Sequence, residues 1–137
     1  MTVNAVRLNH AVLYVSDLDQ SISFYSRAFG MTVMAREPRA NAAFLRLPRS
    51  GNHHDLGLFG VGAQPPRPRG GLGLYHLAWQ VDTIEELEQA RLTLAELLDA
   101  VAALGRDRGD GLAHVAGADD GYVCHGALLG VIGCCFN

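Results

Sequence analysis

The sequence contains one strand-and-helix unit twice, at an offset of 66 residues. Positions 8, 10, 15 and 18 carry Leu, His, Val and Leu, and positions 74, 76, 81 and 84 carry Leu, His, Val and Ile. A helix N-cap residue follows the strand in both copies, at Asp17 and at Thr83. Repetition at a fixed offset indicates two similar modules. Each module carries a histidine, His10 or His76, at the same point of its first strand.

Alternate residues of a strand share a face, and this gives each histidine a direction. In a first strand over residues 6–15, the face of His10 also carries Leu8, Val12 and Tyr14. In the second copy, the face of His76 also carries Leu74, Ala78 and Gln80. The opposite faces are aliphatic and aromatic, which suits burial under a helix. The pair of histidines leaves two interpretations, a shared metal site or two hydrogen-bonded structural histidines.

Composition excludes several classes of function. The chain has 137 residues, which is a typical length for a single domain, with a formal charge of −3 and 49% hydrophobic residues. It has no basic stripe for nucleic acid, no apolar run that spans a membrane and no signal-peptide pattern. Its cysteines, Cys124, Cys134 and Cys135, are odd in number and crowded at one end, so they predict no disulfide framework. We expect a cytoplasmic protein that binds neither nucleic acid nor membrane.

The first half of the sequence predicts a βαβββ module over residues 6–61. After the first strand, Asp17 and Gln20 form a capping pair, and Gly30 ends the helix. Residues 31–35 and 42–47 read as a hairpin, with Pro38 and Asn41 in its connection. Residues 53–59 read as a fourth strand whose start carries His53, His54 and Asp55.

The second half predicts a weaker copy over residues 72–136, after a proline-rich linker over 62–71. Thr83 and Glu86 form a capping box for a helix about twice as long as the first, with a break near Asp99 as one option. Three short strands are expected at 112–116, 122–124 and 128–135, although the many glycines weaken this expectation. The chain as a whole, residues 1–137, is expected to be a single domain of the α+β class.

The chain resembles the vicinal oxygen chelate superfamily, which includes glyoxalase I, bleomycin-resistance proteins and extradiol dioxygenases. The resemblance rests on residues 8–18, on Ser23-Phe24-Tyr25 with Phe29-Gly30-Met31, and on residues 75–82. It implies two βαβββ modules that form a curled mixed sheet with a concave site. His10 and His76 would bind a divalent metal there, with Fe(II) favoured over Mn, Zn or Ni. The expected lining of that site is Val12, Tyr14, Leu56, Leu58, Ala78 and Gln80.

Within the superfamily, the stretch from His53 to Phe59 looks most like the extradiol dioxygenases. These enzymes place a histidine that does not bind the metal at the start of the fourth strand, and His54 is the match. A neutral histidine there takes the second proton of a catechol and later returns it. Tyr122 matches a tyrosine that precedes the last strand of the family. The alternative is that His53 and His54 have no catalytic role and are solvent-exposed residues at the end of a strand.

The third metal ligand of the family is missing at its expected place. Members usually carry an Asp-Pro-Asp-Gly turn and then a strand whose glutamate binds the metal, whereas this chain has Cys124-His125-Gly126-Ala127 and then Ile132. Two neutral imidazoles alone bind a hard metal poorly. Three explanations remain open. Another group substitutes (His125, Asp119, Asp120 or a residue of a second subunit), no metal binds, or the tail departs from the ancestral reading frame.

Three functions therefore stay in view. The first is an extradiol-type dioxygenase that acts on a catechol-like aromatic. The second is another metal-dependent reaction on the same scaffold, such as that of a glyoxalase-like lyase or isomerase, which needs no His54. The third is a metal-free protein that sequesters a drug-like or aromatic ligand, as bleomycin-resistance proteins do. The expected partner is a small aromatic or vicinal-dioxygen ligand. The resemblance also implies a homodimer, since sheets of this kind leave edge strands to be covered.

Overall fold

The computed structural model describes residues 5–65, 76–108 and 131–135. The chain divides into two compact units, Met1–Gly62 and Ala63–Asn137. The first unit contains β1 (Ala11–Val15), α1 (Leu18–Phe29), β2 (Thr32–Glu37), a short 3₁₀ helix (Pro38–Ala40), β3 (Ala42–Arg46) and β4 (Leu56–Gly60). The described part of the second unit contains β5 (His76–Gln80), α2 (Ile84–Arg108) and β6 (Val131–Cys135).

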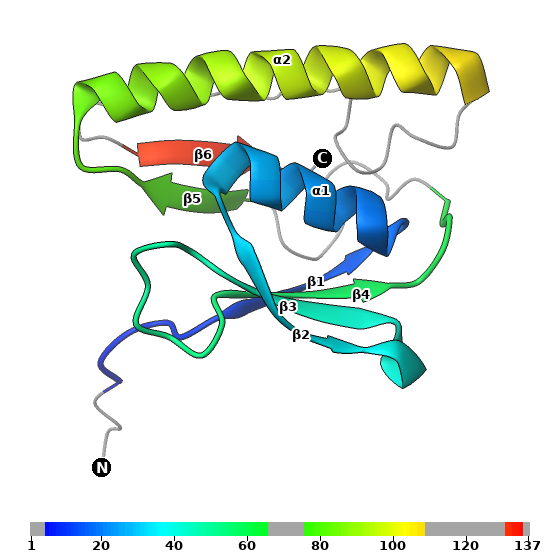
Figure 1. The fold of residues 1–137 in the computed structure, drawn as a ribbon, viewed down its shortest axis with the longest axis horizontal. Coiled ribbons are helices and arrows are strands. Elements are labelled where there is room, and N and C mark those ends of the chain that lie inside the picture. The colour runs from blue at the N-terminus through cyan, green and yellow to red at the C-terminus, as the bar shows by residue number, and fades with distance from the viewer. Residues whose placement is uncertain (1–4, 66–75, 109–130, 136–137) are drawn as a thin grey trace. The chain divides into compact units, whose positions relative to one another are not determined.

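The strands of the first unit form one mixed sheet in the order β1-β4-β3-β2. β1 runs parallel to β4, and the other neighbouring strands are antiparallel. α1 lies across one face of this sheet (Figure 1). The order of elements is the βαβββ order expected for residues 6–61. The α+β class with a curled mixed sheet is thereby confirmed.

α1 begins and ends where its capping residues predict. The Asp17 carboxylate accepts a hydrogen bond from the Gln20 N–H at 2.9 Å, so it satisfies one of the free donors of the first turn. Gly30 ends the helix with φ 65°, a left-handed conformation that glycine adopts without a steric penalty. Between these caps the helix buries one stripe against the sheet, made of Leu18, Ser21, Ile22, Phe24 and Tyr25.

The β2–β3 hairpin turns at Pro38 and Asn41, as the sequence predicts. Asn41 has φ 47°, and its side-chain amide donates to the Gly60 carbonyl at 2.8 Å. The Gly60 N–H in turn donates to the Asn41 carbonyl at 2.9 Å. A Cβ at position 60 would collide with the Asn41 amide, so only glycine allows this close approach. The turn of the hairpin is thereby fixed to the end of β4.

The two faces of the first sheet differ sharply in exposure. Leu45 and Leu58 are 0% exposed, whereas Val12 is 50% and Tyr14 79% exposed. The pairing of β1 with β4 sets Leu58 beside Leu13, on the face that α1 covers. The same pairing sets Gly57 beside Val12 on the open face. Val12 and Tyr14 therefore lie on the open face, as the alternation along β1 predicts.

The expectation that Leu56 and Leu58 line the concave site is wrong. Both side chains are 0% exposed and belong to the core. β4 starts at Leu56, and its register on β1 gives the open-face positions to Gly57 and Phe59 instead. A shift of one residue in the assumed phase of a strand exchanges its two faces.

The first and fourth strands are shorter than the sequence predicts. β1 begins at Ala11 rather than near residue 6, and β4 begins at Leu56 rather than at 53. The first hydrogen bond between the two segments runs from the Ala11 N–H to the Asp55 carbonyl, at 3.0 Å. His10 and His54 therefore sit just before their strands, at the end of the sheet where β1 and β4 start.

The second unit repeats the start of the first. Thr83 caps α2 through a hydrogen bond from the Glu86 N–H at 3.1 Å, and the Glu86 carboxylate accepts from the Asp82 N–H at 3.0 Å. α2 has 25 residues against 12 in α1, which confirms a helix about twice as long. The optional break near Asp99 does not occur, because α2 is continuous from Ile84 to Arg108.

The end of the second unit departs from the repeat. β6 runs antiparallel to β5, with His76 paired to Cys135 and Trp79 to Ile132. In the first unit the corresponding strand, β4, is parallel to β1. The strands expected at 112–116 and 122–124 lie outside the described residues. Among the described helices, none has the length and apolar character needed to cross a membrane.

We expect the two faces of the first sheet to respond differently to truncation. Leu58→Ala should lower the free energy of unfolding by about 2–5 kcal/mol, because it leaves a cavity in the core. Val12→Ala, on the open face, should lower it by about 0.5 kcal/mol. Urea unfolding followed by circular dichroism measures both. Equal losses in the two variants would contradict the assignment of the faces.

Candidate functional site

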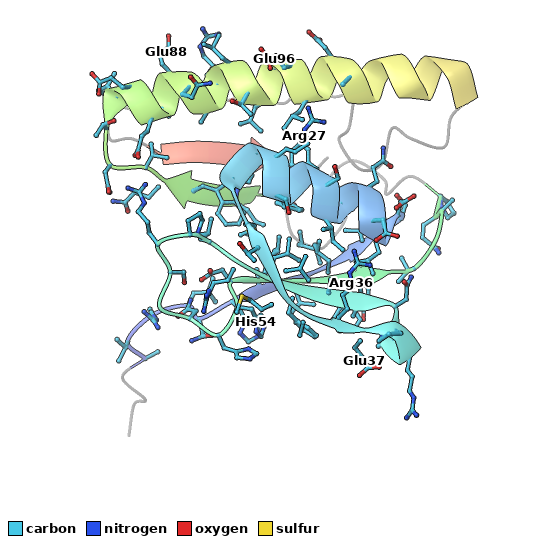
Figure 2. The ribbon with its side chains drawn as sticks, viewed as in Figure 1. Arg27, Arg36, Glu37, His54, Glu88 and Glu96 are labelled. Carbon is cyan, nitrogen blue, oxygen red and sulfur yellow. The ribbon has the colours of Figure 1, made fainter. Side chains whose placement is uncertain are left out.

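Three histidines of the first unit gather where β1 and β4 begin. The ring centroids of His10 and His54 are 4.5 Å apart, with an angle of 44° between the ring planes. The rings of His53 and His54 are 5.4 Å apart, and their Nδ1 atoms are 3.1 Å apart. Figure 2 shows His54 beside the loop that leads into β4. The structure therefore brings together His10, expected as a metal ligand, and His54, expected as a catalytic base.

The ring of His10 is held through one of its two nitrogens. Its Nδ1 lies 3.1 Å from the Asn9 Oδ1, which is an acceptor, so Nδ1–H is the donor of this hydrogen bond. In that tautomer Nε2 keeps its lone pair. Metal-binding histidines use the same arrangement, in which one ring nitrogen donates to an oxygen and the other binds the ion. His10 is exposed and therefore suited to this role.

Asp55 organises the loop over residues 47–55, which carries His53 and His54. Its carboxylate accepts hydrogen bonds from the Leu47 N–H at 2.9 Å, from the Ser50 hydroxyl at 2.7 Å and from the Asn52 side-chain amide at 2.6 Å. Burial acts to raise the pKa of Asp55, but these hydrogen bonds bring it below its ordinary value. Asp55 is thus a charged structural anchor and uses its acceptor sites within the loop.

The environment of His54 favours its neutral form. Partial burial lowers the pKa of His54, and the nearby charges of His10 and then His53 lower it further. The carboxylate of Asp55 acts in the opposite direction but does not restore the ordinary value. A neutral imidazole at neutral pH is what a general base requires.

An aromatic band extends from these histidines along the open face of the sheet. The ring of Phe44 lies 5.0 Å from His54, and the ring of Phe59 lies 6.2 Å from both Phe44 and Tyr14. Gly57 lies beneath the band, and a Cβ there would stand 3.3 Å from Val12 and 3.5 Å from Phe44. We use the name aromatic band for Tyr14, Phe59, Phe44, His54 and His10. Such a surface offers face and edge contacts to a planar ligand.

The other predicted site residues lie in the second unit. His76 is the first residue of β5, and its side chain lies outside the described part of the chain. Ala78 and Gln80 are exposed, while Leu77 and Trp79 between them are half-buried, which agrees with the predicted alternation. A shared site of His10 and His76 remains a prediction. Tyr122 and the substitutes proposed for the third ligand, Asp119, Asp120 and His125, also lie outside the described residues.

The described residues supply only part of a metal site. Within residues 5–65, 76–108 and 131–135, no group of three or more His, Cys, Asp or Glu is arranged to hold an ion. His10 fits one ligand position, with Asn9 as the partner of its second nitrogen. Further ligands would have to come from His76 or from the remainder of the chain.

The expected place of the missing glutamate, Ile132, does not match the register of β6. Ile132 pairs with Trp79, and Cys135 pairs with His76. Residues directly opposite each other in antiparallel strands share a face, whereas successive residues alternate between faces. Position 132 is therefore on the face of Trp79, and position 135 is on the face of His76. A count along the sequence does not give this register, which depends on how β6 pairs with β5.

Comparison with known proteins identifies the family. The chain matches the Glyoxalase/Bleomycin resistance protein/Dioxygenase superfamily over residues 7–123, and it belongs to this superfamily. No curated protein matches it. Among solved structures it is similar to a lactoylglutathione lyase from Agrobacterium tumefaciens, at 24% identity and a TM-score of 0.48, over 68% of this chain and 71% of that chain. The superfamily includes dioxygenases, glyoxalases and resistance proteins, so membership alone does not choose among them.

The sequence did not reveal two contributors to the site. The sequence predicts Phe44 only as part of a hairpin strand, although the β3–β4 pairing sets it beside Gly57 on the open face. Asn52 lies between two predicted strands, and its side chain bonds to Asn9 and to Asp55. The only signal in the sequence was the density of polar residues between Ser50 and Asp55.

We expect the pKa of His54 to lie below its ordinary value, and to rise in His10→Ala. The rise follows because the variant removes a positive charge that opposes protonation of His54. His53→Ala should raise it less, since that residue is the smaller cause. Titration of the ring resonances by NMR measures all three proteins. An unchanged His54 pKa in His10→Ala would show that the two rings are not adjacent in solution.

Proposed function

We propose that the protein is a metal-dependent, extradiol-type dioxygenase that opens the ring of a catechol-like compound. The contact between His10 and His54 carries the proposal. It sets a histidine with a free Nε2 beside a second histidine whose neutral form is favoured. An extradiol reaction needs both, one to hold the metal and one to move a proton. A lyase or isomerase on the same scaffold has no need of His54.

His10 and His76 would hold the metal, with Fe(II) as the preferred ion and Mn, Zn or Ni as alternatives. Two histidines and a carboxylate around iron leave adjacent positions open for a catecholate and for dioxygen. His10 fits its part through the hydrogen bond from Nδ1 to Asn9, which leaves Nε2 free.

His54 would act on the substrate as the base. Its Nδ1 faces His53, which leaves Nε2 to take the proton of a catechol hydroxyl and to return it later. The rate should fall as the pH falls through the pKa of His54, because the protonated ring accepts nothing. Since that pKa is lowered, the base stays available at more acidic pH than an ordinary histidine would allow. Tyr122 remains a proposed catalytic residue by resemblance alone.

The aromatic band would hold the ring of the substrate. Phe44 lies against His54, and Phe59 continues the apolar surface toward Tyr14. Edge and face contacts of this kind contribute about 0.5–1.5 kcal/mol per pair beyond the area they bury. The aromatic band also supports an alternative function, that of a protein that sequesters an aromatic ligand without a metal, because the band makes these contacts without any ion.

We expect three histidine variants to separate these candidates. Protein purified and loaded with Fe(II) without oxygen should bind iron, and it should cleave catechols once dioxygen is admitted. His10→Ala should lose iron affinity by more than about 100-fold, since it removes a ligand rather than a supporting contact. His54→Gln should keep the iron and lose about 10²–10⁴ in kcat.

His53→Gln is the matched control, because it changes an exposed histidine of the same loop, leaves the base in place and offers an amide to the Nδ1 of His54; it should lower kcat far less than His54→Gln. Iron content by mass spectrometry and the absorbance of the ring-opened product are the readouts. A parent protein that binds catechol tightly but neither iron nor oxygen would favour the sequestering protein.

The register of β6 predicts where a carboxylate would complete the site. Cys135→Glu adds it at the position directly opposite His76, whereas Ile132→Glu adds it on the other face of β5 and β6. Cys135→Glu should therefore raise iron affinity above that of the parent, and Ile132→Glu should not. Equilibrium dialysis with Fe(II) without oxygen compares the three proteins. A gain in Ile132→Glu alone would mean that β6 pairs one residue out of this register.

The resemblance further predicts a homodimer. The superfamily often forms dimers, and β1 and β2 are the outer strands of the first sheet. Light scattering at micromolar concentration measures the mass directly. A monomer would remove the option that a second subunit supplies the third ligand. The cytoplasmic location stays a prediction from the sequence.

A further inference from the structure

The contact between His10 and His54 joins two segments that are far apart in the sequence. The β1–β4 ladder begins at Ala11 and Leu56, after both histidines. The hydrogen bond from the Ala11 N–H to the Asp55 carbonyl fixes the ends of the strands but touches neither ring. His10 is exposed, so packing in the core does not hold it. A further contact must set the segment before β1 against the loop before β4.

The side chain of Asn52 makes that contact. Its amide nitrogen donates to the Asn9 carbonyl at 2.8 Å and to the Asp55 carboxylate at 2.6 Å. Its amide oxygen accepts from the Arg7 guanidinium at 2.5 Å. Asn9 directly precedes His10, and Asp55 directly follows His54. Both hydrogens of the amide are thus used to bridge the neighbours of the two histidines.

The loop holds Asn52 in place for this task. The Asn52 N–H donates to the Ser50 hydroxyl at 3.1 Å, and that hydroxyl donates to the Asp55 carboxylate at 2.7 Å. Asn52 is half-buried, so water competes less with its hydrogen bonds than at an exposed site. Asn52 is therefore held by contacts within its own loop as well as by those with the segment over residues 7–10.

We propose that Asn52 is a positioning residue that holds His10 against His54. It touches neither substrate nor metal and acts through Asn9 and Asp55. The consequence for catalysis rests on the proposed function, since it requires His10 as a ligand and His54 as the base. The loss of the contact between His10 and His54 is expected whether or not the proposed function is correct. Misplacement by about 1 Å at a reacting centre is enough to cost about 100-fold in rate.

The test compares Asn52→Ala with Ser50→Ala in the full chain. Ser50→Ala removes the hydrogen bond from the hydroxyl to the Asp55 carboxylate and the one that the hydroxyl accepts from the Asn52 N–H, but it leaves both hydrogen bonds that the Asn52 side chain donates. In the metal-free protein, the nuclear Overhauser effect between the ring protons of His10 and His54 should be lost in Asn52→Ala and kept in Ser50→Ala. In the iron-loaded protein, kcat should fall by about 10–100-fold in Asn52→Ala with KM nearly unchanged.

Asn52→Asp is the second variant, for the case in which Asn52→Ala does not fold. It keeps the shape of the side chain and removes both donated hydrogen bonds, so it should also lose the ring-to-ring effect. Retention of that effect in either folded variant overturns the proposal, as does its absence in the parent. If the parent shows the effect but cleaves no catechol, the proposed function fails while the positioning role of Asn52 stands.

Discussion

The site of the first unit depends on the hydrogen bonds that Asp55 makes where β1 and β4 start. Its carbonyl accepts from the Ala11 N–H and so begins the parallel ladder, while its N–H donates to the Leu45 carbonyl and joins β3. Its carboxylate closes the preceding loop through Leu47, Ser50 and Asn52. One residue therefore fixes the strands, the loop and the direction of His54. A carboxylate with three donors is held firmly, because each bond to a charged acceptor is worth more than a neutral one.

The hydrogen bonds of Asp55 position both the strands of the sheet and the loop of the site. They explain how the histidines are held although they lie at the exposed end of the sheet. The core lies on the α1 side and consists of aliphatic residues such as Leu45 and Leu58. The open face carries the aromatic band, which Gly57 allows to lie close to the strands. The histidines stand at the end of this face, where the polar loop meets the apolar surface. A planar ligand would thus meet apolar contacts along its ring and imidazole nitrogens at one edge.

Much of the first unit is predictable from its sequence because its signals are local. Asp17 marks the start of α1 through its side-chain carboxylate, whereas Gly30 and Asn41 mark turns through their left-handed backbone, and the structure uses all three. The face of Leu56 and Leu58 was not predictable, since it depends on where β4 starts against β1. The contact between His10 and His54 follows from the same non-local register. The role of Asn52 depends on a loop conformation that no pattern in the sequence records.

In the second unit, the sequence repeat predicts the start of the structure but not its last strand. Thr83 and Glu86 cap α2 as the pattern predicts, but β6 pairs antiparallel with β5, and the register sets position 135 opposite position 76. Membership of the superfamily leaves open whether the chain opens an aromatic ring, rearranges a substrate or sequesters a ligand. Oxygen uptake by the iron-loaded protein with a catechol decides this most directly. We expect one dioxygen to be consumed for each catechol opened, whereas binding of the catechol without oxygen uptake or ring opening would rule out the dioxygenase.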